Sequence, residues 1–284
     1  MTIRSTSFFL LCFPLVLSAK EKPAAVPTSQ PGAEKVIAPP KVSPQMQAAL
    51  EKLVMPGVKI NVEKWCVDVQ ASVCLRQGML ELIACTKDTK EHESIILVEA
   101  KPSHIHTALL LLRAKPGNPA MQRAIDPEGT RFVSVEPRGG PIDVFLVIKD
   151  AAGKETERPI SDFIAAADPE DGSSGPEKPA KFPTHTFLFT GSVIHGDGKG
   201  PHEYVCDQSG NVISLSTFGD ELLCLPGIHD QADSLRTWQA NGETLPAADS
   251  KVILRLRPQL APPGDSPPAA KPAQESKNEA PVGK

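Results

Sequence analysis

Hydrophobic and polar residues alternate in many short stretches of the chain, and this period of two predicts β-strands. Alternation is clear over residues 58–62, and β-branched residues occupy alternate positions over 65–73. Successive side chains of a strand point to opposite faces, so alternation indicates a strand with one buried face. We expect 79–85 to return from 65–73 as a hairpin through the turn Arg76-Gln77-Gly78. Further predicted strands lie at 95–98, 132–136, 142–149, 185–194, 212–215 and 252–256.

Two stretches have the pattern of helices instead. Residues 45–54 are amphipathic, and a second helix is expected near 103–114. Pro102 disfavours helical backbone before it, and Ser103 can cap the free N–H groups of the first turn. Residues 108–112 are apolar nearly all round, which predicts that this helix is buried. Because strands outnumber helices and no regular βαβ spacing appears, we expect an α+β fold with a mostly antiparallel sheet.

Composition separates a globular domain, predicted over 45–257, from its flanking segments. Residues 20–44 and 258–284 are rich in proline and alanine and lack a hydrophobic period. Such segments cannot bury enough apolar surface to fold, so we expect a disordered linker and a disordered Pro-rich tail. A similar composition at 168–183 predicts a flexible insertion within the domain.

The first 19 residues have the pattern of a secretory signal peptide. Arg4 supplies a positive charge, residues 8–17 form an apolar region, and Ala19 is a small residue at the expected cleavage site. An uncleaved anchor is the alternative, but the apolar run is about half of the roughly 20 residues that a membrane span needs. We therefore expect an exported protein, periplasmic or secreted, with no transmembrane segment after signal removal.

The charge of the chain narrows the class of partner. The formal net charge is −4, and no basic patch with interleaved aromatic residues appears in the sequence. Nucleic-acid-binding domains usually carry such a patch, so we expect no nucleic-acid partner. The expected partner is an unidentified protein of the cell envelope or a small ligand.

Several motifs between residues 78 and 119 carry a family resemblance. They are Gly-Met-Leu-Glu-Leu at 78–82, Cys85, Thr-Lys-Glu-His-Glu-Ser-Ile at 89–95, His-Thr-Ala-Leu-Leu at 106–110 and Lys-Pro-Gly-Asn-Pro at 115–119. With shorter similar pieces downstream, the chain resembles the YdjY-domain proteins of bacteria over about 55–226. The resemblance implies an exported domain without an established activity. An iron–sulfur role has been attached to the name of that family.

Cysteine spacing argues against an iron–sulfur cluster. Such clusters usually need four thiolates at tight spacings, whereas the first three gaps here are 8, 11 and more than 100 residues. The predicted hairpin also keeps Cys74 and Cys85 several residues apart or on opposite faces, too far for a disulfide. Cys206 and Cys224 are the better disulfide candidates. The odd number of cysteines after the predicted signal peptide leaves at least one thiol free or paired with another chain: Cys66, Cys74, Cys85, Cys206 and Cys224.

Cys85, His92, His104 and His106 are candidate metal ligands, because thiolate and imidazole commonly bind zinc and iron. If the helix begins at Ser103, His104 and His106 lie about 200° apart around its axis and diverge. If it begins later, extended backbone places both rings on one side. We therefore predict no cofactor, and zinc or iron bound by these residues is the alternative.

His92 lies between two carboxylates, Glu91 and Glu93. The His92–Glu93 pair could act as a general base or form a structural hydrogen bond that anchors the loop. Since no complete catalytic set appears, we expect a non-catalytic binding or structural module of the cell envelope. The alternative is a metal- or thiol-dependent enzyme that uses Cys85, His92 and His106, with Glu93 orienting them or acting as base.

Overall fold

A computed structural model describes residues 42–150, 152–167, 181–196, 200, 202–229 and 238–260. These residues cover most of the predicted globular domain. The predicted signal peptide and nearly all of the predicted linker lie outside them, as do most of the 168–183 insertion and most of the C-terminal tail.

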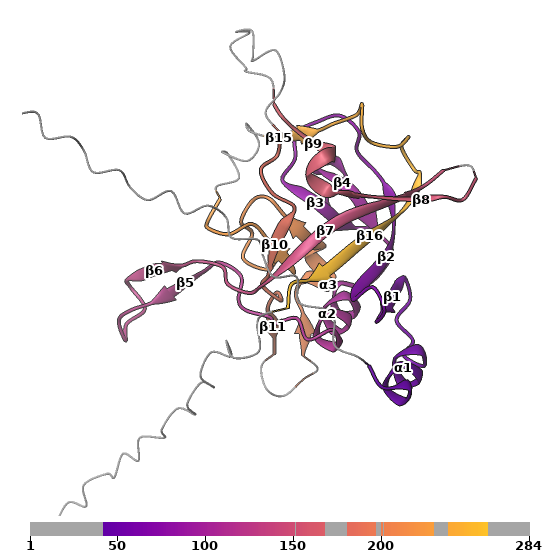
Figure 1. The fold of residues 1–284 in the computed structure, drawn as a ribbon. Helices are drawn as coiled ribbons and strands as arrows, with labels where there is room; N and C mark the ends of the chain where they lie inside the picture. The colour runs from indigo at the N-terminus through magenta and orange to yellow at the C-terminus, as the bar shows by residue number, and fades with distance from the viewer. Residues whose placement is uncertain are drawn as a thin grey trace, which may run out of the picture. The chain divides into compact units, whose positions relative to one another are not determined.

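Eight strands of the described chain close into a β-barrel (Figure 1). They are β2 (Cys66–Val73), β3 (Leu82–Thr86), β4 (Ser94–Val98), β7 (Gly140–Lys149), β10 (Thr186–Phe189), β13 (Asn211–Ser214), β14 (Leu223–Cys224) and β16 (Lys251–Pro258). The order around the ring is β2-β16-β7-β10-β14-β13-β3-β4, and β4 pairs back with β2. Most neighbouring pairs are antiparallel, whereas β3–β4 and β13–β14 are parallel.

The prediction of an α+β fold is therefore wrong, because the domain is mostly β and its sheet is closed. Closure depends on the pairing of β2 with β4, in which Ala71 lies opposite Val98 and Val73 opposite Ile96. Alternation along the sequence identifies the buried face of each strand, and an open sheet and a barrel share that pattern. The sequence pattern alone could not distinguish the two.

The predicted hairpin between 65–73 and 79–85 is also wrong. β2 and β3 are not neighbours, because β4 lies between them and pairs with both. Residues 74–81 instead form a longer connection, in which the Leu80 N–H donates to the carbonyl of Trp238. A turn signal shows where the chain changes direction, but it does not determine which strand the chain meets next.

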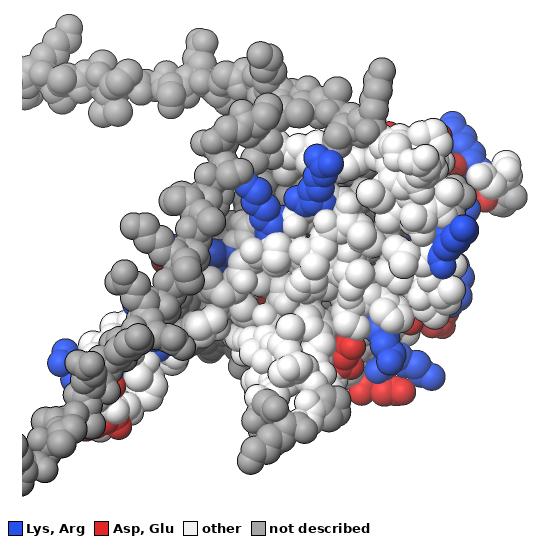
Figure 2. All heavy atoms as spheres, turned by 90° about the horizontal axis from the view of Figure 1, so that it is seen from below, with Lys and Arg blue, Asp and Glu red and all other residues white. Residues whose placement is uncertain are grey.

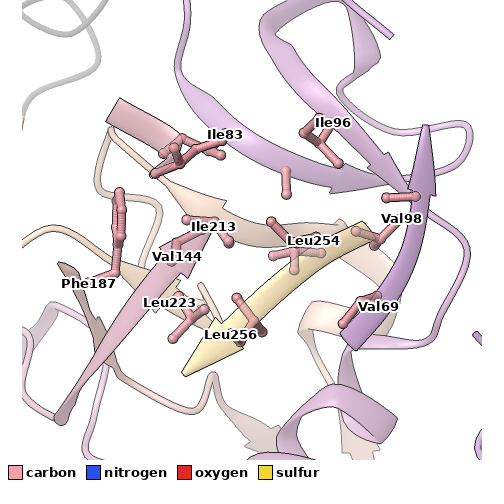
Figure 3. Packing of buried hydrophobic residues seen from close by; sticks show 14 of the residues in the cluster. Val69, Ile83, Ile96, Val98, Val144, Phe187, Ile213, Leu223, Leu254 and Leu256 are labelled. Atoms are coloured by element: carbon pink, nitrogen blue, oxygen red, sulfur yellow. The ribbon is translucent and has the colours of Figure 1, made fainter. Parts of the chain in front are cut away.

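The interior of the barrel is the hydrophobic core (Figure 3). Every barrel strand contributes at least one side chain with no exposed surface: Val69 of β2, Ile83 of β3, Ile96 of β4, Val144 of β7, Phe187 of β10, Ile213 of β13, Leu223 of β14 and Leu254 of β16. Full burial of one such side chain contributes about 1.5–3 kcal/mol to folding. The core therefore holds all eight strands together.

Two helices of two or more turns lie in the described chain, α1 (Pro44–Glu51) and α2 (Pro102–Leu111), and α3 (Cys206–Ser209) is a single turn. α1 begins after Ser43, whose hydroxyl accepts the N–H of Met46 at 3.2 Å. Proline at the first helical position suits both α1 and α2, because the missing N–H would have no partner there.

The buried helix predicted near 103–114 is α2, which packs against β2 and buries Ile105, Ala108 and Leu109 (Figure 1). Ser103 does not cap it. Instead the Ser103 N–H and hydroxyl donate to the two carboxylate oxygens of Asp207, each at 2.7 Å. The capping carboxylate comes from α3, about a hundred residues downstream, so local sequence could not reveal it.

The remaining elements surround the barrel. β1 (Val58–Asn61) pairs with β2, and β8 (Glu155–Pro159) pairs with β7. Three two-stranded ribbons and two 3₁₀ turns complete the described elements: β5 (Met121–Ala124) with β6 (Phe132–Val135), β9 (Ile164–Ala166) with β15 (Trp238–Ala240), β11 (Ile194–His195) with β12 (Glu203–Tyr204), η1 (Glu91–Glu93) and η2 (Ile160–Phe163). In the described part of the chain, no helix has the length and apolar character needed to cross a membrane.

Candidate functional site

The described structure does not assemble the predicted metal ligands into one site. Among the described residues, no group of three or more His, Cys, Asp or Glu side chains is placed to hold a metal ion. Cys85 is fully buried in β3. His92 lies in η1 with its side chain 77% exposed, and its Nε2 is 3.8 Å from Oε2 of Glu93. The imidazole is therefore largely in solvent, whereas the Cys85 thiol is buried.

His106 on α2 takes part in a different contact, with Tyr204 and Gly191. Its Nδ1 lies 2.8 Å from the hydroxyl of Tyr204, and that hydroxyl donates to the Gly191 carbonyl at 3.0 Å. Since the single phenolic proton goes to Gly191, Tyr204 accepts from an Nδ1–H of His106. Burial lowers the pKa of His106, which favours this neutral form. His106 thus ties α2 to the loop after β10.

His104, two residues earlier on α2, does not share that contact. Its Nδ1 is buried without a hydrogen-bond partner among the described residues. The two histidines therefore have different surroundings, as the helical geometry predicts if the helix begins near Ser103.

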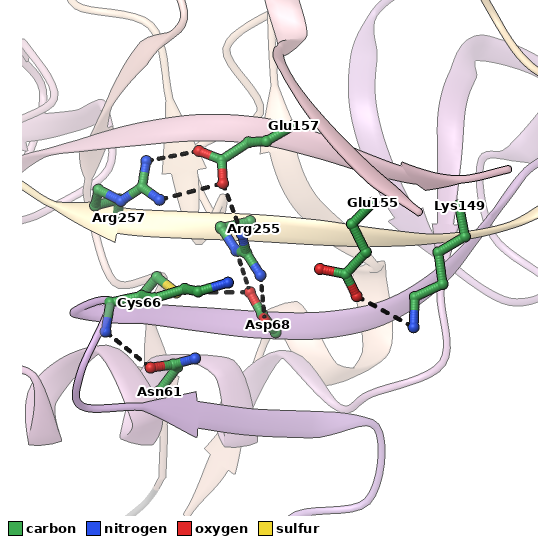
Figure 4. A network of polar contacts seen from close by, with 9 residues as sticks. Asn61, Cys66, Asp68, Lys149, Glu155, Glu157, Arg255 and Arg257 are labelled. Atoms are coloured by element: carbon green, nitrogen blue, oxygen red, sulfur yellow. Dashed lines mark hydrogen bonds and ion pairs between the residues drawn. The ribbon is translucent and has the colours of Figure 1, made fainter. Parts of the chain in front are cut away.

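A partly buried charge network surrounds Arg255 of β16 (Figure 4). Arg255 is 4% exposed. Its Nε and Nη2 donate to the two carboxylate oxygens of Asp68 on β2, at 2.6 and 2.8 Å. Its Nη1 donates to Glu157 on β8 at 2.6 Å, and Arg257 donates to the same carboxylate at 2.8 Å. We call Asp68, Glu157, Arg255 and Arg257 the Arg255 network.

Hydrogen bonds within this network favour the charged forms of Arg255 and Glu157. The bonds with Asp68 raise the pKa of Arg255, so the guanidinium stays charged despite its burial. Burial opposes ionisation of Glu157, but its bonds with Arg257 and Arg255 outweigh burial and lower its pKa. The Cys66 thiol beside Asp68 has its pKa raised to about 11 by burial and by that carboxylate. Arg255 and Glu157 are therefore charged at neutral pH, and the neighbouring Cys66 thiol is protonated.

A groove of about 400 Å³ lies beside this network on the outer face of β1, β2 and β16. We call it the Arg255 groove. It is lined by the basic residues Lys59, Lys64, Lys149 and Arg255, the acidic residues Asp68 and Glu155, and the uncharged residues Gly57, Val58, Asn61, Gln70 and Ile253. Two of the basic residues are matched, Arg255 by Asp68 and Lys149 by Glu155 at 3.2 Å. Lys59 and Lys64 have no carboxylate partner among the described residues, so the groove carries excess positive charge.

Basic side chains are sparse on one face of the described chain. On the face drawn in Figure 2, Lys and Arg side chains are few and stand apart, and most of the described surface is uncharged. The Arg255 groove brings four basic residues together, Lys59, Lys64, Lys149 and Arg255.

Sequence reasoning missed the Arg255 network, although one signal was present. Arg255 stands between Leu254 and Leu256 in a strand of alternating hydrophobic residues, and all three are buried. A charged residue inside a short apolar strand indicates a buried ion pair. Its partner Asp68 lies 187 positions away in the sequence, so the pair itself could not be predicted.

The fold and the network define a closed β-barrel domain with a buried ionic cluster on its outer side. A family model for the YdjY domain matches residues 58–257, so the chain belongs to the YdjY domain family. The match begins at β1 and ends in β16, and it includes all four residues of the Arg255 network. No curated protein and no solved structure matches the chain.

Proposed function

We propose that this YdjY domain is an exported, non-catalytic binding module that holds a small anionic ligand in the Arg255 groove. The observation that carries the proposal is the pair Lys59 and Lys64, two basic residues without a carboxylate partner in the described chain, beside the paired charges of Arg255 and Asp68. The pattern of residues 1–19 supports export.

The charges of the groove favour an anion over a cation. The Asp68 carboxylate is already bound at both oxygens by Arg255, and Glu155 is bound to Lys149. An ammonium group about 4 Å from an anion contributes about 1 kcal/mol in bulk water and about 4 kcal/mol at an effective dielectric constant of 20. Lys59 and Lys64 are exposed, so together they contribute about 2 kcal/mol in bulk water and up to about 8 kcal/mol at the lower dielectric constant. Affinities of 1 mM and 1 μM correspond to about 4 and 8 kcal/mol, so hydrogen bonds within the groove have to contribute as well.

The groove has the composition of a binding site and not of a nucleophilic active site. Its described lining contains no His, Cys, Ser or Thr. These four residue types form the covalent intermediates of many enzymes when a base lies in hydrogen-bond reach, and lysine or carboxylate does so in others. The two carboxylates of the groove are already paired, Asp68 with Arg255 and Glu155 with Lys149. The lining does offer the amides of Asn61 and Gln70, which can donate hydrogen bonds to a polar ligand.

The proposal is tested by calorimetric titration with inorganic phosphate and with citrate as probes. The variant Lys59→Ala/Lys64→Ala should bind at least tenfold more weakly than the wild-type chain. The control Lys87→Ala/Arg131→Ala removes the same charge from exposed positions that do not line the groove, and it should bind as the wild type does. The proposal fails if the wild type binds neither probe, or if both variants lose affinity equally.

A further inference from the structure

The ribbon of β5 and β6 projects from the barrel (Figure 1). In the described chain its two strands pair with each other and with no third strand. Its large apolar side chains are exposed, among them Met121, Ile125 and Phe132, the last by 57%. An isolated two-stranded hairpin is marginally stable at best in water, and a third strand or a packed face stabilises it. The ribbon is therefore a surface on which a partner would add stability.

A groove of about 400 Å³ between α1 and β1 exposes the free edge of β1. It is lined by every residue of the stretch 58–63. Because successive side chains of a strand point to opposite faces, a groove that touches each residue of β1 runs along the edge of that strand. In the described chain β1 pairs with β2 alone, so this edge has no neighbouring strand. We call it the β1 groove, and it is lined by the apolar residues Leu50, Leu53, Met55, Val58, Ile60 and Val62 and by the polar residues Gln47, Lys59, Asn61 and Glu63.

The register of β1 against β2 shows which backbone groups face the β1 groove. The N–H of Gln70 on β2 donates to the Gly57 carbonyl at 2.8 Å. In an antiparallel ladder the groups of every second residue point to the partner strand, so those of Lys59 and Asn61 also face β2. The N–H and the carbonyl of Ile60 therefore point away from β2, where a further strand can pair with them.

The outer edge of β6 offers the matching groups. The Ile125 N–H donates to the Arg131 carbonyl at 2.9 Å, just beyond the paired strands of the ribbon. By the same alternation Val133 and Val135 face β5, and the backbone groups of Phe132 point outward. β1 and β6 are each four residues long. The two free edges therefore have equal length and complementary hydrogen-bonding groups.

We propose that the β6 edge of one copy of the chain pairs with the β1 edge in the β1 groove of a second copy. Figure 1 shows the ribbon and α1 on opposite sides of the barrel, so a chain's own ribbon does not reach its own groove. Antiparallel pairing of Ile60 with Phe132 places these two side chains on the same face. The exposed Phe132 ring then packs beside the apolar lining of the groove. This contact does not require anion binding, so the two proposals fail independently.

The charges beside the two edges are complementary in this register. Continued past the strand ends into the adjoining turns, it brings Arg131 close to Glu63 and Glu128 close to Lys64. All four side chains are exposed, and none has an ion-pair partner among the described residues. Opposite charges at neighbouring cross-strand positions stabilise a sheet. They therefore favour a second copy of this chain as the strand that fills the groove.

The contact joins two different surfaces of the same chain. Each added copy therefore presents a free groove or a free ribbon to the next, and assembly either closes into a ring or continues as an open chain. Such head-to-tail contacts make the size of the assembly depend on protein concentration.

Sedimentation velocity of the full chain, without added phosphate or citrate, tests the contact. We expect larger species as the wild-type concentration rises from about 1 μM to about 1 mM. Leu53→Glu places a charge in the β1 groove and Phe132→Glu places one on the ribbon, and each should weaken association at least tenfold. The control Ile228→Glu changes a residue that is 48% exposed, like Leu53 at 47%, but lies on neither surface, so it should associate as the wild type does. Circular dichroism establishes that each variant folds. A wild type that stays monomeric throughout, or folded variants that associate equally well, would overturn the proposal.

Mixing the two variants distinguishes a ribbon-to-groove contact from any other self-association. The Leu53→Glu chain keeps an intact ribbon and the Phe132→Glu chain keeps an intact groove, so together they retain one complete contact. We expect an equimolar mixture to form a complex of one copy of each with the affinity of the wild-type contact, although each variant associates weakly alone. A mixture that associates no more than its separate components would contradict the pairing of ribbon with groove.

Exchange of two charges tests the register. Glu63→Arg and Arg131→Glu each replace an attraction by a repulsion, so each should weaken association. The double variant restores opposite charges and should associate as the wild type does. If it associates no better than either single variant, the two edges do not pair in the proposed register.

Discussion

Replacing Arg255 by Met should destabilise the barrel strongly while preserving the bulk of the side chain. Arg255 is 4% exposed and donates two hydrogen bonds to Asp68 and one to Glu157. The variant leaves the Asp68 carboxylate, whose side chain is 13% exposed, without its cation. Removing one partner of a buried ion pair typically costs 3–5 kcal/mol, because the remaining charge is neither solvated nor paired. We therefore expect the free energy of unfolding to fall by about 3–5 kcal/mol.

Urea unfolding measures this change, and the same strand supplies a control. Lys251 also lies on β16 and pairs with Glu99 at 2.6 Å, but the two side chains are 74% and 43% exposed. Exposed ion pairs contribute about 0–1 kcal/mol, so Lys251→Met should change the unfolding midpoint little. If Arg255→Met costs less than about 1 kcal/mol, or no more than Lys251→Met, the reasoning about the buried network is wrong.

The network also predicts how stability depends on pH. The pKa of Glu157 is lower in the folded protein than its ordinary value of 4.5, because its bonds with Arg257 and Arg255 outweigh the effect of burial. A group whose pKa is lower when folded stabilises the protein above its unfolded pKa, and that stabilisation is lost as the pH falls through its folded pKa. Stability should therefore decline below about pH 4.5, and the decline should be smaller in Glu157→Gln. If stability falls with pH equally steeply in the wild-type and Glu157→Gln proteins, Glu157 makes no such contribution.

Two further substitutions test packing and hydrogen bonding elsewhere in the domain. A Cβ on Gly117 would lie 1.9 Å from the Arg138 carbonyl oxygen. Gly117→Ala should therefore lower the free energy of unfolding by about 1–3 kcal/mol, the usual cost of an added methyl group in a packed site. An unchanged urea midpoint would show that the two backbone segments separate freely. Tyr204→Phe removes the hydrogen bonds to His106 and Gly191. The thermal midpoint of this variant should fall by an amount equivalent to about 1–2 kcal/mol. An unchanged midpoint would mean that water replaces both bonds.

The sequence predicted individual elements better than their arrangement. The strand expected at 58–62 is β1, the stretch at 252–256 lies within β16, and the buried helix near 103–114 is α2. Hydrophobic periodicity suffices for these, because it reflects which side of an element faces the core. The closed barrel and the insertion of β4 between β2 and β3 depend on pairing between distant strands, which no local pattern contains.

The candidate sites, like the fold, could be predicted only in part from the sequence. The motif around His92 predicted a cluster with Cys85, but the imidazole is 77% exposed in η1 while Cys85 is fully buried in β3. The disulfide expected between Cys206 and Cys224 is absent from the described structure, in which both thiols are free. The Arg255 network joins β2, β8 and β16, so it becomes visible only once the barrel is assembled.

The measurement that tests the binding proposal most directly is NMR chemical-shift mapping of the wild-type chain during titration with citrate. Binding in the Arg255 groove predicts saturable shifts at the backbone amides of Lys59, Lys64 and Gln70, and smaller effects at Lys87 and Arg131, which do not line the groove. Saturable shifts confined to another surface, or no saturable shifts at all, would contradict the assignment of this groove as the ligand site.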